Sequence, residues 1–474
     1  MSPIRPAPVA RLAEARRLYG ILRRERERLA PGERRLVSWV YELPSLDPLT
    51  VLERLAPHPK VHFYGEDPLG GERILGYGEL ESYGLTPAGP ERFLGSRRFL
   101  ETCWRELTHL KETGHQDGLG PQIFGGFSFF PETAGTSAFP PAFWFLPRYQ
   151  LRQDHRGSFL RCTLVLTTAA DLEETTEQIL AHLEFLRCLG AQTAESSSAP
   201  SPDLRCLTLP QGHFAQTVAE ILEQINQGGL EKLVLAQSLD VSLPPHFSLS
   251  ACLRRLRCHY PDCYLFSLGN PQGHSFVGAS PERLLSVRQG QLTIDALAGS
   301  APRGNTPAAD RALAQALRES AKEQREHQTV LGAILRQLEE QGLAPQCRPQ
   351  QVLQLSNIQH LWTEIQAPLP ADLHPLDLAA LLHPTPAVAG VPRERACELI
   401  RRYETFDRGL YASPLGWLDA QGNCELRVGI RSALITGSRA RLYAGAGIVR
   451  GSDPHQEQKE IELKLRALGQ ALLS

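Results

Sequence analysis

The amino-acid sequence predicts an α+β protein built from layers of strands and helices. Strand-like and helix-like segments are intermixed along the chain, and the connections between the strand-like runs are long. No segment repeats at a fixed period, which argues against a tandem array. With 474 residues, of which 42% are hydrophobic and 22% charged, the chain can form one large domain or two to three ordinary ones.

The expected elements follow in chain order. Residues 125–131 and 159–168 resemble strands, and residues 171–189 have a helical pattern. Residues 189–203 are rich in Ser, Ala and Pro and predict an exposed loop. Residues 213–229 then predict a helix that ends in glycines, and residues 232–243 predict a strand.

Composition excludes several classes of partner. Lys and Arg total 50 against 52 acidic residues, so a net charge of -2 provides no basic surface for nucleic acid or an anionic membrane. The N-terminus lacks the apolar core of a secretory signal, and no apolar run approaches the length of a membrane span. Ten cysteines without CxxC or zinc spacing indicate reduced, mostly buried thiols. We therefore expect a cytoplasmic protein.

A glycine-rich segment, AGAGIVRGSDPHQEQKE, occupies residues 444–460. Gly445, Gly447 and Gly451 follow a GxGxxxG spacing, which differs from the GxGxxG of dinucleotide-binding turns. Glycines next to a helix start instead offer backbone N–H groups to an anion. Asp453 as N-cap and Pro454 at the first helical position mark that helix start.

The helix after Asp453 carries charged residues on one face. Glu457, Glu460 and Lys464 occur at i, i+3 and i+7 and therefore lie on the same side. They form either a solvated face with an ordinary Glu460 to Lys464 ion pair or one half of an oxygen-rich site.

A second carboxylate lies in the strongly helical segment 322–341. Glu326 shares a side with the apolar residues Val330 and Leu331, which indicates that its carboxylate points inward. Two such carboxylates from separate helices would make an all-oxygen site suited to Mg²⁺. The alternative is that the charged residues of this segment simply lie on a solvent-exposed helix face.

Two further residues are candidates for proton transfer. Glu282, in FVGASPERLLSV, lies between two strand-like runs, where chemistry is commonly placed, although a glutamate there can also be solvated. Lys232 begins the apolar strand KLVLAQ, so its amine either reaches solvent along the strand or is desolvated and available as a base.

Taken together, these segments resemble the chorismate-utilising enzymes. The resemblance is carried, in order, by nine motifs: KLVLAQ, FVGASPERLL, DALAGSAPRG, KEQREH, IQHLWTEI, LLHPTPAVAGVP, RGLYASPLGW, VGIRSA and AGAGIVRGSDPHQEQKEIELK. The family comprises isochorismate synthase, anthranilate synthase component I, aminodeoxychorismate synthase component I and salicylate synthase. The motifs cover residues 213–474 densely. Upstream, FYGED and FGGFSFFPE look like the isochorismate synthase branch of the menaquinone or phylloquinone type.

The resemblance implies an architecture of two large antiparallel β-sheets that form a sandwich flanked by helices. In this arrangement residues 1–205 would form an N-terminal subdomain within the same sandwich, and residues 206–474 the chorismate-binding catalytic domain. Both a monomer and a homodimer remain open.

The resemblance also implies roles for the residues above. Lys232 would activate water for attack at C2 of chorismate, and Glu282 would protonate the departing C4 hydroxyl. The family's Mg²⁺ ligands correspond to Glu326 and Glu460, with Glu457 close by, and the ion would chelate the ring carboxylate.

The substrate cradle of the family corresponds to residues in five of the nine motifs. A glycine-rich turn and three polar side chains would hold the two carboxylates of chorismate, and a histidine and a small-residue turn would line its ring. These residues are Gly445, Gly447, Arg431, Tyr411 and Lys464 for the carboxylates, and His360, Ala298 and Gly299 for the ring.

A few positions favour one branch of the family. Ala298 stands where aminodeoxychorismate synthase carries a nucleophilic lysine, and the anthranilate and aminodeoxychorismate enzymes typically lack Lys232. Ser300 replaces the usual threonine, and Gln237 replaces a common arginine or serine. The resemblance thus implies an isochorismate synthase, an isomerase that serves menaquinone or phylloquinone synthesis.

Other functions remain as alternatives. A salicylate synthase would form isochorismate and then eliminate pyruvate, and component I of anthranilate or aminodeoxychorismate synthase would transfer an amine. A binding module without catalysis is disfavoured because Lys232 and Glu282 would be of little use to it.

Overall fold

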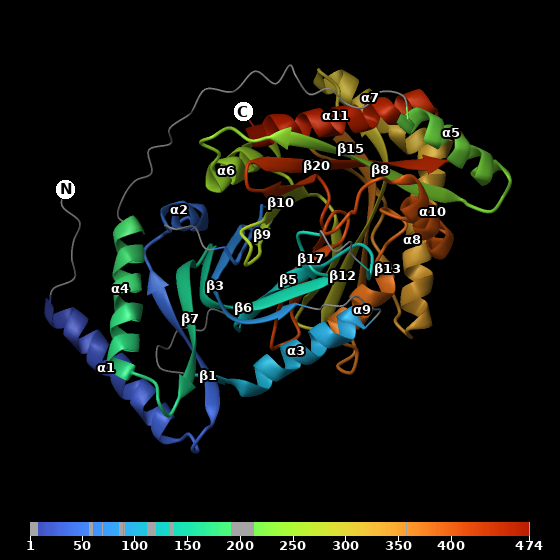
Figure 1. The fold of residues 1–474 in the computed structure, drawn as a ribbon. Coiled ribbons are helices and arrows are strands. Elements are labelled where there is room, and N and C mark those ends of the chain that lie inside the picture. The colour runs from blue at the N-terminus through green and yellow to red at the C-terminus, as the bar shows by residue number, and fades with distance from the viewer. Residues whose placement is uncertain are drawn as a thin grey trace.

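The computed structural model of the 474-residue chain has the α+β fold class that the sequence predicts (Figure 1). The structure describes residues 8–55, 60–68, 70–84, 89, 91–110, 120–132, 137–190, 213–356 and 358–473. Within these residues, strands and helices are intermixed from the N-terminal to the C-terminal end. No helix among them is both long enough and apolar enough to cross a bilayer.

One sheet carries most of the N-terminal strands and the glycine-rich strand. Neighbouring strands in it are antiparallel except for β1 and β4, which are parallel. Its strands, in spatial order, are β16 (Gly390–Val391), β8 (Lys232–Ser242), β20 (Arg439–Val449), β19 (Ser432–Thr436), β10 (Ser275–Ser280), β9 (Tyr264–Gly269), β2 (His62–Asp67), β3 (Glu72–Gly84), β6 (Ala142–Asp154), β7 (Gly157–Thr167), β1 (Arg34–Leu43) and β4 (Leu107–His109).

The second sheet is antiparallel throughout. Its strands, in spatial order, are β5 (Gln122–Phe127), β17 (Pro414–Asp419), β18 (Cys424–Val428), β11 (Arg283–Arg288), β12 (Gln291–Pro302) and β15 (Ile358–Pro368), with β13 (Gln346–Cys347) and β14 (Gln351–Gln354) on the outer edge.

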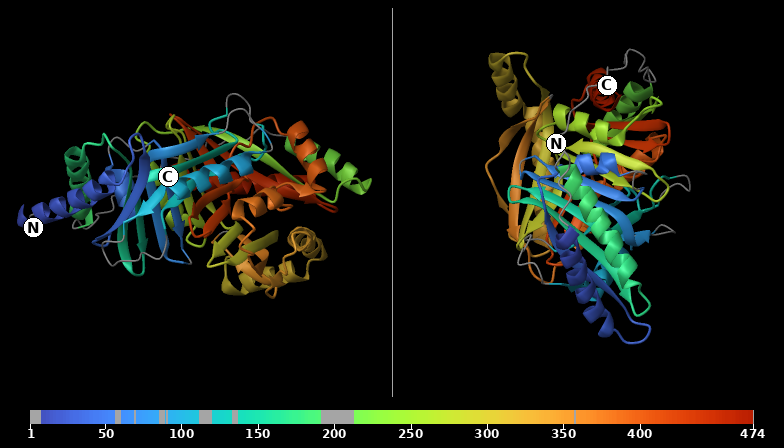
Figure 2. Two further views of the ribbon diagram at one scale, coloured as in Figure 1. Left: turned by 90° about the horizontal axis from the view of Figure 1, so that it is seen from below. Right: turned by 90° about the vertical axis from the view of Figure 1, so that its left-hand side faces the viewer.

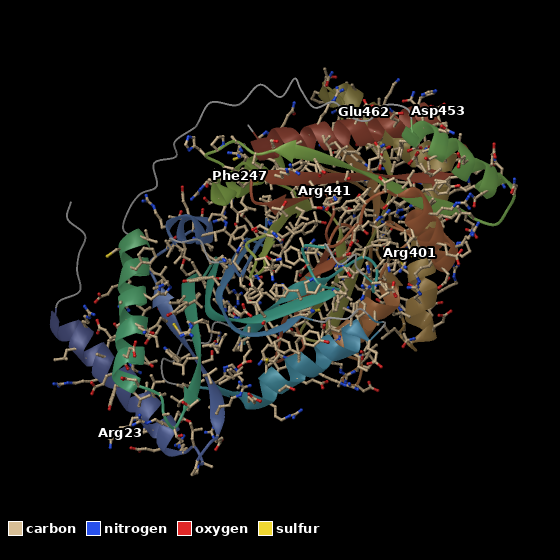
Figure 3. The ribbon with its side chains drawn as sticks, viewed as in Figure 1. Arg23, Phe247, Arg401, Arg441, Asp453 and Glu462 are labelled. Atoms are coloured by element: carbon tan, nitrogen blue, oxygen red, sulfur yellow. The ribbon has the colours of Figure 1, made fainter. Side chains whose placement is uncertain are left out.

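The two sheets are continuous through β6. One edge of β6 pairs with β3 over its length, whereas the other edge pairs first with β5 and then with β7. The two predicted sheets are therefore present, and one strand belongs to both. Side chains fill the space between the layers (Figure 3).

Helices cover the outer faces of the sheets. Helix α11 packs on β20 and against α5 and α6, and α8 packs on β12. Helices α1 and α4 pack together at the end of the molecule far from α7 and α8 (Figure 2). The helices are α1 (Pro8–Glu27), α2 (Pro48–Arg54), α3 (Arg92–Glu106), α4 (Leu172–Gly190), α5 (His213–Asn226), α6 (Leu249–His259), α7 (Pro307–Glu319), α8 (Ala321–Glu340), α9 (Pro375–Leu382), α10 (Arg393–Tyr403) and α11 (Pro454–Leu473).

The structure confirms most of the expected elements. The strand predicted over 125–131 ends earlier, at Phe127, and the loop predicted from Leu189 begins later, because α4 continues to Gly190. The rest of that loop and the predicted boundary between residues 205 and 206 lie outside the described residues. Strands from both sides of that boundary pair directly, β2 with β9 and β5 with β17.

The close approach of β5 to β6 depends on Gly125. A Cβ atom there would lie 2.1 Å from the carbonyl oxygen of Phe143 and 2.7 Å from the Cα of Trp144. Because both are backbone atoms, they cannot move aside cheaply. We expect Gly125→Ala to lower the free energy of unfolding by about 1–3 kcal/mol, the usual range for overpacking.

Urea denaturation of this variant measures the effect. Gly229→Ala is the control, because a Cβ at Gly229 meets no atom within 4 Å. Equal denaturation midpoints for the two variants would contradict the tight packing of β5.

Candidate active site

Lys232 is the first residue of β8, and its side chain is buried, with 2% of its surface exposed. Its ammonium donates a hydrogen bond of 2.8 Å to Oε1 of Glu326, which α8 supplies. Of the two outcomes that the sequence left open, the structure therefore shows the desolvated lysine. The buried charge is tolerated because a carboxylate pairs with it.

Gly447 makes room for this ion pair. A Cβ atom at Gly447 would lie 2.8 Å from Oε1 of Glu326 and 3.2 Å from Cε of Lys232. A Cβ at Gly445 would lie 2.9 Å from the hydroxyl of Tyr411. Any larger residue at either position would displace a polar group of the site.

The expectation of a glycine-rich turn at these positions is wrong. Gly445 and Gly447 lie within β20 and pair with Ala236 and Val234 of β8. The turn comes after the strand, at Gly451, which has a φ of 89°. Glycines in a strand mark a close approach of neighbouring groups, and here the neighbours come from distant parts of the chain.

Glu282 lies in the connection between β10 and β11, between two strands as the sequence predicts. It is buried, with 4% of its surface exposed, so the alternative of a solvated glutamate is wrong. Burial, together with the carboxylate of Asp295, raises the pKa of Glu282 to about 8, although Lys232 opposes the shift. The structure thus brings Glu282 and Lys232 into one buried region, with Glu282 in its protonated form near neutral pH.

Asp295 is a residue of this region that the sequence did not single out. It is buried on β12 and accepts hydrogen bonds from Nε1 of Trp362 at 3.0 Å and from the backbone N–H of Arg283 at 3.3 Å. An acidic residue within the mostly buried strand DALAG was the available signal.

Three further glutamates from α8 and α11 gather beside the Lys232–Glu326 pair, together with two further lysines. Lys464 donates to Oε1 of Glu460 at 2.6 Å and to the carbonyl oxygen of Gly445 at 2.9 Å. Lys322 lies 3.4 Å from Glu457 and 3.6 Å from Glu323. The expected pair of Glu460 with Lys464 is present.

The electrostatics of this group reflect an excess of carboxylates. Burial and the neighbouring Glu326 raise the pKa of Glu323. Burial also raises the pKa of Glu457, against Lys322 and with support from Glu460. Burial acts likewise on Glu460, but Lys464 and Lys322 outweigh it and hold the pKa of Glu460 below its usual value.

The donor chemistry of this group suits a hard cation such as Mg²⁺, because all of the donors are carboxylate oxygens and they outnumber the lysines. In the described part of the chain, however, no three His, Cys, Asp or Glu side chains converge as a ready metal site. Glu326, Glu457 and Glu460 each lie against a lysine instead. These pairs would have to open for the carboxylates to share one ion.

A chain of hydrogen bonds links this carboxylate group to Arg431. The backbone N–H of Ser300 donates to Oε2 of Glu323 at 2.9 Å, and Oγ of Ser300 lies 2.9 Å from Nδ1 of His360. Nη2 of Arg431 lies 3.4 Å from Nε2 of His360. Because arginine only donates, we assign Nε2 as the acceptor and place the proton on Nδ1.

His360 is held neutral. Burial, followed by the charges of Arg431 and Lys464, lowers the pKa of His360 to about 3. It lies on β15, opposite Ser300 of β12. The segment with Ala298 and Gly299, expected as a turn, is a bulge within β12, where Gly299 has a φ of 79°. The bulge breaks the alternation of side chains along the strand.

Tyr411 and Arg431 complete the expected set. The ring of Tyr411 is buried and stacks on Tyr443, with 4.9 Å between centroids. Arg431 has a φ of 48°, a backbone conformation that non-glycine residues seldom adopt and that is often found at functional sites. Its Nη1 donates to Sγ of Cys263 at 3.4 Å.

Sequence reasoning did not assign Glu323 or Lys322 to the site, and it noted Ser300 only as a replacement of the usual threonine. Glu323 precedes Glu326 by three residues on α8, so helical periodicity could have placed both carboxylates on one face. At the start of α11, by contrast, the prediction is confirmed, because Oδ1 of Asp453 accepts the N–H of Gln456 at 2.8 Å.

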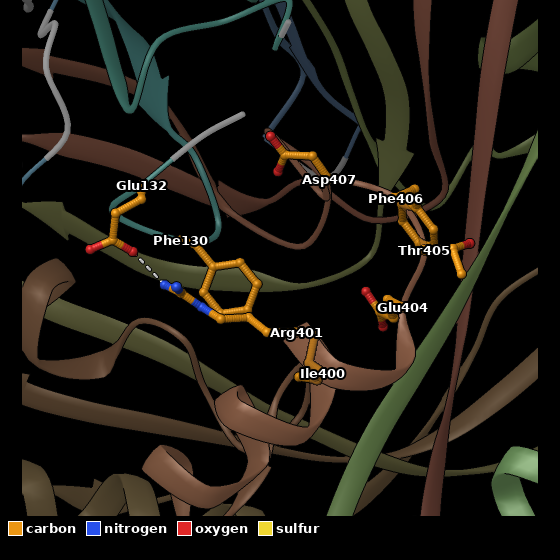
Figure 4. A pocket seen from close by; sticks show the side chains of 8 residues that line it. All are labelled: Phe130, Glu132, Ile400, Arg401, Glu404, Thr405, Phe406 and Asp407. Carbon is orange, nitrogen blue, oxygen red and sulfur yellow. Dashed lines mark hydrogen bonds and ion pairs between the residues drawn. The ribbon is translucent and has the colours of Figure 1, made fainter. Parts of the chain in front are cut away.

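A cavity of about 340 Å³ lies at the C-terminal end of α10 (Figure 4). None of the predicted site residues lines it, so it does not mark the predicted site. Its lining residues are Phe130, Glu132, Ile400, Arg401, Glu404, Thr405, Phe406 and Asp407.

Comparison with known proteins agrees with this fold. The family model of chorismate binding enzymes matches residues 23–473. The chain is 32% identical to isochorismate synthase MenF of Bacillus subtilis, over 92% of this chain and 93% of that protein. It is also 32% identical to the salicylate biosynthesis isochorismate synthase of Pseudomonas aeruginosa, over 92% of this chain and 90% of that protein.

The solved structure of the menaquinone-specific isochorismate synthase MenF of Escherichia coli superposes with a TM-score of 0.74 at 28% identity. The match covers 97% of this chain and 100% of that one. The chain therefore belongs to the family of chorismate-binding enzymes, and the resemblance carried by its motifs is confirmed.

The environment of Glu282 leads to a prediction about pH. Asp295→Asn removes the negative charge that helps to raise the pKa of Glu282, so this pKa should fall. If Glu282 acts in its protonated form, the alkaline limb of the pH–rate profile then moves to lower pH. Asp240→Asn, at an exposed position on β8, is the control and should leave the profile in place. An unchanged alkaline limb in Asp295→Asn would contradict the coupling.

Proposed function

We propose that this protein is an isochorismate synthase, which converts chorismate reversibly into isochorismate and depends on Mg²⁺. The observation that carries the proposal is that Lys232 and Glu282 are both buried in one region, where burial and Asp295 raise the pKa of Glu282 to about 8 against the opposing charge of Lys232. A base and a protonated acid in one desolvated region suit the exchange of one hydroxyl group for another.

The proposed reaction gives each of these residues one proton to move. Lys232 must first give up its proton and its ion pair with Glu326, and then takes a proton from the water that attacks C2 of chorismate. Glu282 donates its proton to the C4 hydroxyl, which leaves as water while the two ring double bonds shift. Forming the C2–O bond and breaking the C4–O bond leaves the substrate's composition unchanged, so the reaction is an isomerisation.

The remaining residues would orient the substrate. Arg431, Lys464 and the hydroxyl of Tyr411 are the donors for the two carboxylates of chorismate, and Gly445 and Gly447 keep the strand face open to them. Ala298 supports this branch of the family because its methyl group cannot act as an amine nucleophile. Gly299 and His360 lie beside it and would line the ring.

Glu326 and Glu460 would hold the Mg²⁺ ion, with Glu457 close by. When bound, the ion would supply positive charge to fix the ring carboxylate. Lys232 and Lys464 form ion pairs with Glu326 and Glu460. Both ion pairs would therefore have to break when Mg²⁺ binds.

The proposal extends to the pathway. Relatives named isochorismate synthase MenF in two bacteria support a role in menaquinone synthesis, or in phylloquinone synthesis, which needs the same product. A cytoplasmic location belongs to this proposal, and both a monomer and a homodimer are compatible with it.

One chromatographic assay tests the reaction. Purified protein incubated with chorismate and Mg²⁺, without ammonia, should form isochorismate, and isochorismate should return chorismate. Salicylate with pyruvate would instead identify a salicylate synthase. Anthranilate or aminodeoxychorismate formed from ammonium would assign the protein to an amine-transferring branch.

Removal of either proton-transfer group should slow the reaction strongly. We expect Lys232→Ala and Glu282→Gln each to reduce the rate by about 10²- to 10⁴-fold, the usual contribution of general acid–base catalysis. Loss of the base should remove the acidic limb of the pH–rate profile, and loss of the acid should remove the alkaline limb. Chorismate binding, measured by calorimetry, should survive in both variants.

Lys459→Ala, at an exposed position on α11, serves as the control and should keep the wild-type rate. If both site variants stay within about threefold of wild type, far below the range for acid–base catalysis, the assignment of the pair is wrong.

The metal assignment is tested by Glu460→Ala. With one ligand missing, the protein should need more Mg²⁺ or lose turnover, while its circular dichroism spectrum stays unchanged. Glu462→Ala, on the same helix, is the matched control. Wild-type rate and Mg²⁺ dependence in Glu460→Ala would place the ion elsewhere.

A further inference from the structure

A second buried ion pair, between Arg408 and Glu404, lies next to strand β8. Arg408 is 1% exposed, and its Nε donates to Oε2 of Glu404 at 2.8 Å while Nη2 donates to Oε1. Glu404 follows the last residue of α10 and forms part of the cavity wall in Figure 4. The two side chains therefore meet in the fork-to-fork geometry in which an arginine is held most rigidly.

This pair is bonded to the backbone of the strand that carries Lys232. Nη2 of Arg408 donates to the carbonyl oxygen of Val234 at 2.9 Å, and Oε1 of Glu404 accepts the N–H of Ala236 at 2.8 Å. Val234 and Ala236 are the residues of β8 opposite Gly447 and Gly445. Nη1 of Arg408 donates to the carbonyl oxygen of Val388 at 2.8 Å.

The guanidinium of Arg408 also reaches Tyr411. It lies 5.7 Å from the ring centroid of Tyr411 and 4.3 Å from that of Phe129. The backbone N–H of Tyr411 donates to the carbonyl oxygen of Arg408 at 2.8 Å. Tyr411 is therefore held from Arg408 by both its backbone and its ring, and Tyr443 stacks on the same ring.

We propose that Arg408, held by Glu404, is a positioning residue that fixes the Tyr411 hydroxyl beside Gly445 for substrate binding. The Arg408–Glu404 pair fixes the orientation of the arginine side chain more than it stabilises the fold, because buried ion pairs are often no more stabilising than apolar side chains of equal volume. Four hydrogen bonds leave its guanidinium one orientation. The inference rests on the proposed function, which assigns Tyr411 to the substrate.

A double-mutant cycle tests the inference, with Arg408→Lys, Tyr411→Phe and the double variant. Lysine keeps the charge but cannot form the bidentate fork or contact Val234 and Val388 together. We expect each single variant to raise KM for chorismate about tenfold, with kcat changed less than threefold, as follows from lost substrate binding. If Arg408 acts through Tyr411, the double variant should be no worse than the weaker-binding single variant.

Additive effects on KM would overturn the inference, because they would mean that the two residues act independently. A wild-type KM in either single variant would overturn it as well. Arg395→Lys alters an exposed arginine–glutamate pair on α10 and is the matched control, expected to keep the wild-type KM.

Two measures keep the test decisive. If Arg408→Lys does not fold, Glu404→Gln replaces it in the same cycle, because glutamine retains an acceptor for the N–H of Ala236 but weakens the hold on Arg408. The cycle is measured as chorismate consumption and by calorimetric binding of chorismate, whichever product forms. A wild-type product other than isochorismate would refute the proposed function and leave the result for Arg408 standing.

Discussion

The site depends on one buried ion pair, between the ammonium of Lys232 and the carboxylate of Glu326, 2.8 Å apart. A single buried charge would be too costly, so each partner requires the other. The pair in turn requires glycine at position 447, because any side chain there would displace the carboxylate. Three segments far apart in the sequence, β8, α8 and β20, are thus fitted to one another by a single interaction.

The pairing of β8 with β20 places the glycines of β20 beside the strand that carries Lys232. Its register places Gly447 opposite Val234 and Gly445 opposite Ala236, so both gaps open on the strand that Lys232 begins. Helix α11 packs on β20 and brings Lys464 to the carbonyl oxygen of Gly445. The sheet therefore supplies Lys232 and the two glycines, whereas α8 and α11 supply the carboxylates and Lys464.

Sequence patterns correctly predicted the features that depend on residues close together in the chain. The N-cap at Asp453, the position of Glu282 between two strands and the strand at Lys232 were all correct, since each depends on a few neighbouring residues. The glycines of β20 and the bulge at Gly299 were mistaken for turns, because a glycine fits both and only the opposing strand distinguishes them. Asp295 escaped notice because its proximity to Glu282 is a tertiary contact.

The burial that makes Glu282 an acid also explains why the site keeps a neutral histidine. Positive charge is already concentrated at Arg431 and Lys464, so a charged His360 would add repulsion inside a desolvated region, and its pKa falls to about 3. A neutral imidazole can accept from Arg431 and donate toward Ser300, whose backbone N–H is bound by Glu323. Through this chain, the orientation of Arg431 is linked to Glu323, which lies one helical turn from Glu326 on α8. The proposed substrate-binding residues and the carboxylates proposed to bind the cation are therefore neighbours along one hydrogen-bonded chain.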